Sequence, residues 1–237
     1  MLAVFKKEMR AYFTTPIGYV FLAVFIAVGA VIFARFTYMA GEGEARINDY
    51  FSWMVVAYVL LIPILTMKIF SDELKGKTDQ LLLTSPVSIT GIVIAKYFAA
   101  LCMYLLAVAV SSVNYIFLAA NGYKLQFGIT AEMFIFMILI GLACIAVGIF
   151  ISALTESQLV AALISMVTLS LMLFTAAYNN MIPFAWLRTL LDYVSISSRY
   201  KQLADGLFDF TSVLYYLSLA AVFVLLTIRV FEKKRWH

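Results

Sequence analysis

The triplet Gly76-Lys77-Thr78 has residue types that could hold a phosphate, because a lysine and a hydroxyl follow a glycine. Phosphate loops of ATP-binding proteins need another glycine five residues before this one, and a strand ahead of the loop. Ser71 occupies the position of that glycine, and no strand is predicted ahead of it. The context therefore argues against ATP binding by this motif.

Side chains for other chemistry are scarce. The single histidine is the last residue, His237, which argues against a histidine-based metal site, acid–base site or Ser/His/Asp triad. Cys102 and Cys144 lie inside apolar runs, without the spacing of a metal site or a disulfide framework. Glu132 and Glu156 fall at the ends of predicted spans, where solvated charges are usual. We therefore expect no catalytic residue, no metal and no cofactor in this chain.

Composition points to the membrane. Hydrophobic residues make up 65% of the 237 residues and charged residues 13%, whereas soluble domains carry about 25% charged residues. A chain of this length has too little interior to hide that excess. The net charge of +4 fits the basic cytoplasmic flanks of a membrane protein better than binding of nucleic acid. We expect an all-α polytopic membrane protein with a single domain over 1–237.

Six apolar runs are long enough to cross a bilayer as helices. They cover about 17–36, 52–70, 91–119, 132–153, a fifth run that ends near Tyr178, and 211–230. In the fourth run Gly141, Cys144, Gly148 and Ser152 recur on one face, and small residues at that spacing let two helix backbones approach closely. Lys96 lies near the inner end of the third run, where its ammonium could extend to the headgroup layer.

The positive charges orient these spans. Eleven of the 17 Lys and Arg residues fall at the end that carries both termini: Lys6, Lys7, Arg10, Lys68, Lys75, Lys77, Lys96, Arg229, Lys233, Lys234 and Arg235. The others, Arg35, Arg46, Lys124, Arg188, Arg199 and Lys201, fall at the opposite end. Because cytoplasmic flanks carry the excess of Lys and Arg, we expect both termini in the cytoplasm.

The first residues predict an amphipathic helix over 2–13. One face carries Leu2, Phe5, Met9 and Tyr12, and the other carries Lys6, Lys7 and Arg10. This combination is typical of a helix that lies in the headgroup layer of the membrane. Pro16 follows at a position suited to the first turn of a new helix. A secretory signal peptide is the less favoured alternative, because the next apolar run is too long and lacks a convincing cleavage site.

Residues 68–88 form the long charged interruption in the first half of the chain. Ser71 is placed to cap a helix whose first turn holds Asp72 and Glu73, and Pro86 would end it. One stripe of this helix carries Leu74, Thr78, Leu81 and Ser85, with Leu82 beside it. The helical periodicity supports two interpretations of this stripe equally well. The stripe fits a groove on a soluble cytoplasmic partner, or it lies on the membrane with its leucines in lipid.

The segment 179–209 is the longest external segment and is not uniformly polar. Apolar residues around Pro183, Trp186 and Leu190 alternate with charged ones, and Arg199 follows in the same segment. This pattern predicts one or two short re-entrant helices, which must be buried in protein or line water. The alternative is a surface loop with interfacial aromatic side chains.

Four segments of the chain carry a family resemblance. They are Phe5-Lys6-Lys7-Glu8-Met9-Arg10; Thr78 with Leu81-Leu82-Leu83-Thr84-Ser85-Pro86-Val87-Ser88, followed by Lys96; Ser152-Ala153-Leu154-Thr155-Glu156-Ser157-Gln158; and Arg235-Trp236. With these segments the chain resembles the permease subunits of ABC-2 type transporters. The similarity is closest to the group that includes the gliding-motility permease and the nitrous-oxide-reductase maturation permease. The chain departs from the usual family residues at Lys77, Gln80, Ser157 and Asp205.

The resemblance implies a six-helix permease in the bacterial cytoplasmic membrane, paired with a second copy or a related permease. Two copies of a separate cytoplasmic ABC ATPase would bind ATP and Mg and dock on a cytoplasmic coupling helix. The residues expected to make that contact are Asp72, Glu73, Lys77, Thr78, Gln80, Leu81, Leu82, Thr84 and Pro86, with Glu156 nearby. ATP hydrolysis would then drive export of an unidentified substrate. In the alternative, the chain transmits the movement to a large extracytoplasmic partner without moving a solute.

Overall fold

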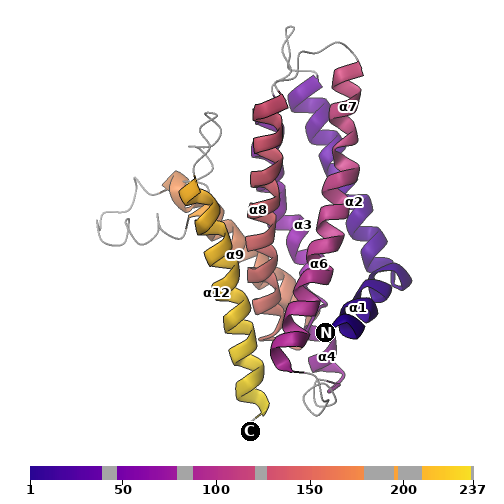
Figure 1. Ribbon diagram of the computed structural model, residues 1–237, viewed down its shortest axis with the longest axis vertical. Coiled ribbons are helices and arrows are strands. Elements are labelled where there is room, and N and C mark those ends of the chain that lie inside the picture. Colours follow the sequence, from indigo (N-terminus) through magenta and orange to yellow (C-terminus); the bar gives the residue numbers. More distant parts are fainter. Residues whose placement is uncertain (39–46, 79–87, 121–126, 179–194, 197–209, 236–237) are drawn as a thin grey trace.

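The computed structural model describes residues 1–38, 47–78, 88–120, 127–178, 195–196 and 210–235, and these ranges contain helices and no strand. In chain order the helices are α1 (Leu2–Thr14), α2 (Pro16–Ile32), the π-helix η1 (Phe33–Tyr38), α3 (Ile47–Thr66), α4 (Ser71–Lys75), α6 (Ile89–Ser111), α7 (Val113–Ala120), α8 (Phe127–Ser152), α9 (Gln158–Tyr178) and α12 (Phe210–Arg235). Figure 1 shows long helices side by side, with α1, α4 and both chain termini toward the lower end.

The prediction of six spans is confirmed. Within the described ranges, six helical segments are long and apolar enough to cross a membrane: Pro16–Arg35, Asp49–Lys75, Ile89–Phe117, Thr130–Ser152, Gln158–Thr175 and Phe210–Arg235. The predicted boundaries differ mainly where polar residues continue a helix. The last helix extends to Arg235 because Glu, Lys and Arg are good helix formers. The second span contains a break, since α3 ends at Thr66 and α4 begins at Ser71.

The helix α8 lies at the centre of the bundle. It packs against α3, α6, α9 and α12, and every residue from 143 to 149 is buried. A helix that is apolar on all sides can be buried on all sides. The outer helices α9 and α12 instead expose large apolar side chains such as Leu163 and Leu225, as expected for surfaces in contact with lipid.

The small residues of α8 receive side chains from neighbouring helices. A Cβ built on Gly141 would lie 2.3 Å from the ring of Tyr104 on α6, and one built on Gly148 would lie 2.3 Å from Thr66 Oγ1 on α3. The sequence predicted a close approach of helix backbones at these residues, whereas the space beside both glycines is filled by side chains of neighbouring helices. The packing involves different neighbours along the face of α8 rather than one partner helix.

Hydroxyl pairs hold the middle of the bundle. The hydroxyls of Tyr58 and Tyr104 are 2.6 Å apart, and Tyr104 donates to the carbonyl of Met137 at 2.7 Å. Toward the other end, the Tyr50 hydroxyl and Ser111 Oγ are 2.7 Å apart. All four of these side chains are buried. We call Tyr50, Tyr58, Tyr104 and Ser111 the tyrosine layer.

The helix α1 packs against α6 and α2. Tyr12 is buried, Phe5 and Met9 pack against the core, and Leu2 is 70% exposed. The basic face is exposed, with Lys6, Lys7 and Arg10. The predicted helix and its two faces are confirmed, but part of the apolar face contacts protein rather than lipid. Its position in the headgroup layer stays a prediction.

A sharp corner joins α1 to α2. Thr15 is extended, with φ −100° and ψ 152°, and Pro16 begins α2 at the first helical position, as predicted. Gly18 allows the close approach, because a Cβ there would lie 2.1 Å from the carbonyl oxygen of Tyr12.

Candidate functional site

The short helix α4 is the centre of the candidate site. It ends at Lys75, because Gly76 is its C-cap and Lys77 has a positive φ of 53°. The amide of Gly76 donates to Asp72 O at 2.9 Å, and the amide of Thr78 donates to Glu73 O at 3.0 Å. These bonds close the helix with a left-handed turn.

The predicted helix over 71–86 is therefore wrong in the part that the structure describes. Thr78 lies in the turn after α4 and does not continue a helical stripe from Leu74. Lys77 and Thr78 are exposed. The remaining predicted contact residues of this segment lie outside the described residues: Gln80, Leu81, Leu82, Thr84 and Pro86, with Ser85 of the same stripe.

The prediction that Ser71 caps α4 is also wrong. Phe70 is the N-cap, and Ser71 is buried as the first helical residue. Ser71 Oγ donates to Ser152 O on α8 at 3.1 Å, while the amides of Phe70 and Ser71 donate to Ser152 Oγ at 3.1 and 3.2 Å. Ser152 Oγ also contacts Met67 O at 3.2 Å. The side chain of α8 thus satisfies the orphan amides at the start of α4.

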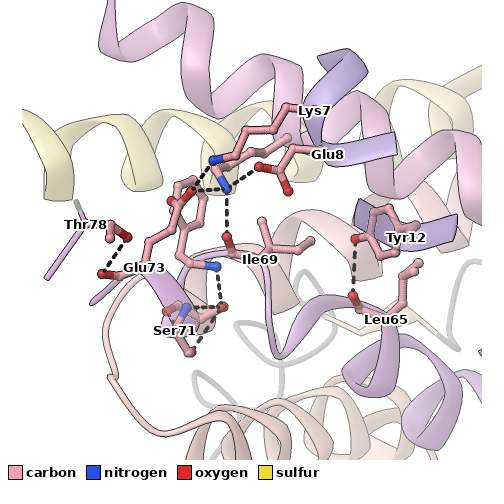
Figure 2. Close-up of polar contacts among 11 residues, drawn as sticks. Lys7, Glu8, Tyr12, Leu65, Ile69, Ser71, Glu73 and Thr78 are labelled. Carbon is pink, nitrogen blue, oxygen red and sulfur yellow. Dashed lines mark hydrogen bonds and ion pairs between the residues drawn. The ribbon is translucent and has the colours of Figure 1, made fainter. Parts of the chain in front are cut away.

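Lys96 on α6 forms the charged centre of the site. Its ammonium donates to Glu8 Oε1 on α1 at 2.9 Å and to Ile69 O at 2.9 Å, and it pairs with Glu73 Oε1 on α4 at 3.0 Å. The same ammonium lies 5.0 Å from the centroid of the Phe70 ring. Figure 2 draws these contacts around Glu8, Ile69 and Glu73.

The sequence predicted that the Lys96 ammonium extends out of the bundle to the headgroup layer, but the ammonium is instead enclosed by protein groups. Lys96 is 2% exposed. Two carboxylates and a carbonyl accept from the three N–H donors of its ammonium. A buried charge is tolerated when it is paired and hydrogen-bonded. We call Glu8, Ser71, Glu73, Lys96 and Ser152 the α4 joint.

Further contacts surround the α4 joint. Lys7 Nζ lies 3.6 Å from Glu73 Oε1, and Lys68 Nζ lies 3.3 Å from Asp72 Oδ2. Gln158 at the start of α9 donates to Asp72 Oδ1. Polar contacts thus connect α4 to α1, α6, α8 and α9.

Tyr12 connects α1 to the end of α3. Its hydroxyl donates to Leu65 O at 3.4 Å, as Figure 2 shows. Burial raises the pKa of the Tyr12 hydroxyl far above its usual value, and the nearby Glu8 carboxylate adds to the shift. The hydroxyl therefore stays protonated and available as a donor.

The predicted site residues fall into separate groups. Asp72 and Glu73 lie together with the basic face of α1 at Lys7. Glu156 is exposed on the turn between α8 and α9, between Ser152 and Gln158, which both contact α4. In the predicted re-entrant segment, Pro183, Trp186, Leu190 and Arg199 lie outside the described residues.

Two residues of the outer segment are described. Ser195 and Ile196 are buried, and the Tyr216 hydroxyl on α12 donates to Ile196 O at 3.0 Å. Ile196 lines a small pocket together with Tyr58 and Cys144. This part of the chain therefore reaches side chains of α3 and α8.

Sequence reasoning did not select Glu8, Lys96 or Ser152 as site residues. A signal existed for Lys96, since an ionisable residue inside an apolar span predicts a partner of opposite charge. Glu8 and Ser152 give weaker signals, because their partners lie far away in the sequence. Among the described residues, no group of three His, Cys, Asp or Glu side chains could hold a metal ion.

The arrangement so far defines a class: a polytopic helical membrane protein with a short helix held by buried ionic contacts at one end. The chain belongs to the ABC-2 family of transporter proteins, because the family pattern described as ABC-2 family transporter protein matches residues 15–174. That range includes Ser71, Lys96 and Ser152. Comparison with curated proteins found no match.

Membership implies a permease subunit of an ABC transporter that associates with an ABC ATPase. Six apolar helices agree with a multi-pass membrane protein. The narrower similarity to gliding-motility and nitrous-oxide-reductase maturation permeases stays a prediction.

Proposed function

We propose that this chain couples ATP hydrolysis by a cytoplasmic ABC ATPase to export of a substrate across the bacterial inner membrane. It works as one of two permease subunits, with both termini in the cytoplasm, and each permease binds one ATPase subunit. The observation that carries this proposal is the α4 joint, in which one short helix at the end of the bundle contacts α1, α6 and α8.

The mechanism follows from the linkage of binding to conformation. An ATPase shifts the equilibrium between two permease states only through contacts that differ between them. Residues 71–78 and the turn at Glu156 supply such contacts in the proposal. A displacement of α4 must move Glu73 relative to Lys96, or move α6 and α1 with it. A displacement of Ser71 likewise acts on α8 through Ser152.

The test is co-purification of the ATPase with the Leu81→Asp variant. The proposal places Leu81 against the ATPase. The Leu81→Asp substitution therefore removes an apolar contact and places a charged carboxylate in the interface. The affinity for the ATPase should fall about tenfold or more. The matched control is Leu2→Asp, since Leu2 is a 70% exposed leucine of α1. Its recovery of ATPase should equal that of the wild type.

Two results would contradict the proposal. Full recovery of the ATPase with Leu81→Asp would remove this segment from the interface. Purification of the wild-type protein from its native membranes without any ABC ATPase would remove the coupling role itself.

A further inference from the structure

A pocket of about 180 Å³ lies beside the α4 joint, between α1, the corner to α2, α4 and α6. Its lining includes charged groups from α1 and α4 and the apolar side chains of Ile17 and Ile69. Ile17 belongs to the first turn of the candidate span Pro16–Arg35, and Lys96 lies about two turns into α6. The pocket therefore lies beside the start of the first span, and we place this start at the headgroup level of a bilayer.

The pocket has cationic groups with donors to spare. Lys96 has none, because Glu8, Glu73 and Ile69 take its three donors. Lys7 and Lys68 differ, since each contacts a single carboxylate among the described residues, at 3.6 and 3.3 Å. An ammonium has three N–H donors. Both lysines line the pocket and can therefore donate to an anionic group within it.

The pocket also has an acceptor that lacks a donor. Glu73 Oε1 pairs with Lys96 and Lys7, but Glu73 Oε2 is buried and accepts no hydrogen bond in the described part of the chain. A buried carboxylate oxygen without a donor is costly. This oxygen has almost no accessible surface in its present orientation. A rotation of the Glu73 carboxylate would bring it to a ligand with N–H donors in the pocket, and the new hydrogen bond would remove that cost.

The charges of the lining balance. Lys7, Lys68 and Lys96 face Glu8, Asp72 and Glu73, so the lining has no net charge. A zwitterion matches such a site better than an anion, because each of its two charges can face a group of opposite sign.

We propose that this pocket binds the headgroup of a zwitterionic phospholipid with a primary ammonium, of the phosphatidylethanolamine class. The phosphate accepts hydrogen bonds from Lys7 and Lys68. The Glu73 carboxylate rotates toward the pocket, and the ammonium donates to its Oε2. The glycerol end lies against the apolar side chains of the lining, such as Ile17. The lining shares Asp72 and Glu73 with the segment proposed to contact the ATPase, but lipid binding needs no ATPase.

The test uses the full-length protein in micelles of a detergent without a phosphate group, with a trace of phosphatidylethanolamine that carries a photoreactive diazirine in one acyl chain. Labelling is located by peptide mass spectrometry and competed with unlabelled lipids. Phosphatidylethanolamine should compete at about tenfold lower concentration than phosphatidylcholine, because the methylated choline group has no N–H donor. Labelled peptides should come from α1 or from the start of α2.

Variants sharpen the test. Lys68→Ala should lower labelling about threefold to tenfold through the loss of one charge-assisted contact. Lys7→Ala provides a second variant if Lys68→Ala elutes as a misfolded protein. Lys6→Ala is the matched control, because Lys6 is an exposed lysine of α1 that does not line the pocket, and its labelling should not change.

Three outcomes would overturn the proposal. Equal competition by phosphatidylcholine would remove the role of the ammonium. Stronger competition by phosphatidylglycerol would assign the pocket to anionic lipid. Competition by free phosphoethanolamine at the same concentration as the lipid would assign it to a soluble phosphate ester.

Discussion

Two buried polar regions of the bundle are built in different ways. The α4 joint holds a full charge, Lys96, between Glu8 and Glu73 from two other helices. The tyrosine layer contains only neutral hydroxyls, such as those of Tyr58 and Tyr104, and each bonds to a neighbour directly. The tyrosine layer is buried, as are Ser71, Lys96 and Ser152, while the side chains of Glu8 and Glu73 are 15% and 13% exposed.

The difference concerns what remains after one group is removed. A missing tyrosine hydroxyl leaves a neutral partner without its hydrogen bond, which costs less than an unpaired buried charge. A missing lysine leaves two largely buried carboxylates without the ammonium between them, where each repels the other. The α4 joint is therefore stable only while its charges balance, and a small displacement there changes the energy of three helices. This property is expected of a contact that transmits a displacement of α4 to α1, α6 and α8.

Lys96→Met should have the largest effect. It leaves Glu8 without its cationic partner and Glu73 with only Lys7 at 3.6 Å, and the free energy of unfolding should fall by about 3–5 kcal/mol. Denaturant titration in detergent measures this fall. The triple variant Glu8→Gln, Lys96→Met, Glu73→Gln should regain most of the stability, because no unpaired charge is left. If the single variant matched the wild type, the charge balance would not stabilise the α4 joint.

Ser152→Ala should have the next largest effect. It removes the acceptor for the amides of Phe70 and Ser71. The free energy of unfolding should therefore fall by about 1–3 kcal/mol. Ser218→Ala is the control, because Ser218 is exposed and donates only locally to Tyr215 O. Thermal unfolding of the two variants in the same detergent gives the comparison. Equal midpoints would show that α4 does not depend on α8.

Gly148→Ala tests the packing between the two regions. The new Cβ would lie 2.3 Å from Thr66 Oγ1, and the overpacking should cost about 1–3 kcal/mol. The matched control is Gly128→Ala on the same helix, where nothing lies within 4 Å of the new atom. That control should be neutral or slightly stabilising. Adding Thr66→Ala to Gly148→Ala should restore part of the loss.

Tyr104→Phe should have the smallest effect, about 0.5–1.5 kcal/mol. The variant removes the hydrogen bond to Met137 O and the contact with Tyr58 but leaves no charge behind. Tyr19→Phe is the control, since Tyr19 is 58% exposed. A loss as large as that of Lys96→Met would remove the contrast between neutral and charged regions.

Sequence patterns predicted the elements of this fold well, because each span is encoded locally. Length and apolar composition located all six spans, and the two faces of α1 followed from helical spacing. The corner at Pro16 was also local, since proline fixes the start of α2. Small residues on α8 predicted close packing, but local spacing could not say which neighbours would fill the space.

The sequence predicted much less of the candidate site. Asp72 and Glu73 were identified, but the length of α4 was wrong, because Gly76 and Lys77 end the helix in a left-handed turn that helical periodicity does not reveal. Ser71 was assigned to a cap, although its partner Ser152 lies 81 positions away. No local pattern encodes such a pairing. The same reason explains why the partners of Lys96 were missed.

The order of the residues in the α4 joint has a consequence for the biogenesis of the protein. A ribosome makes Glu8 and Glu73 before it makes Lys96, and chains acquire structure from the N-terminus during synthesis. Both carboxylates are therefore present when α6 is inserted, and the lysine finds its counter-charges already at the membrane. A permuted gene that places α6 ahead of α1 would deny Lys96 these partners during insertion.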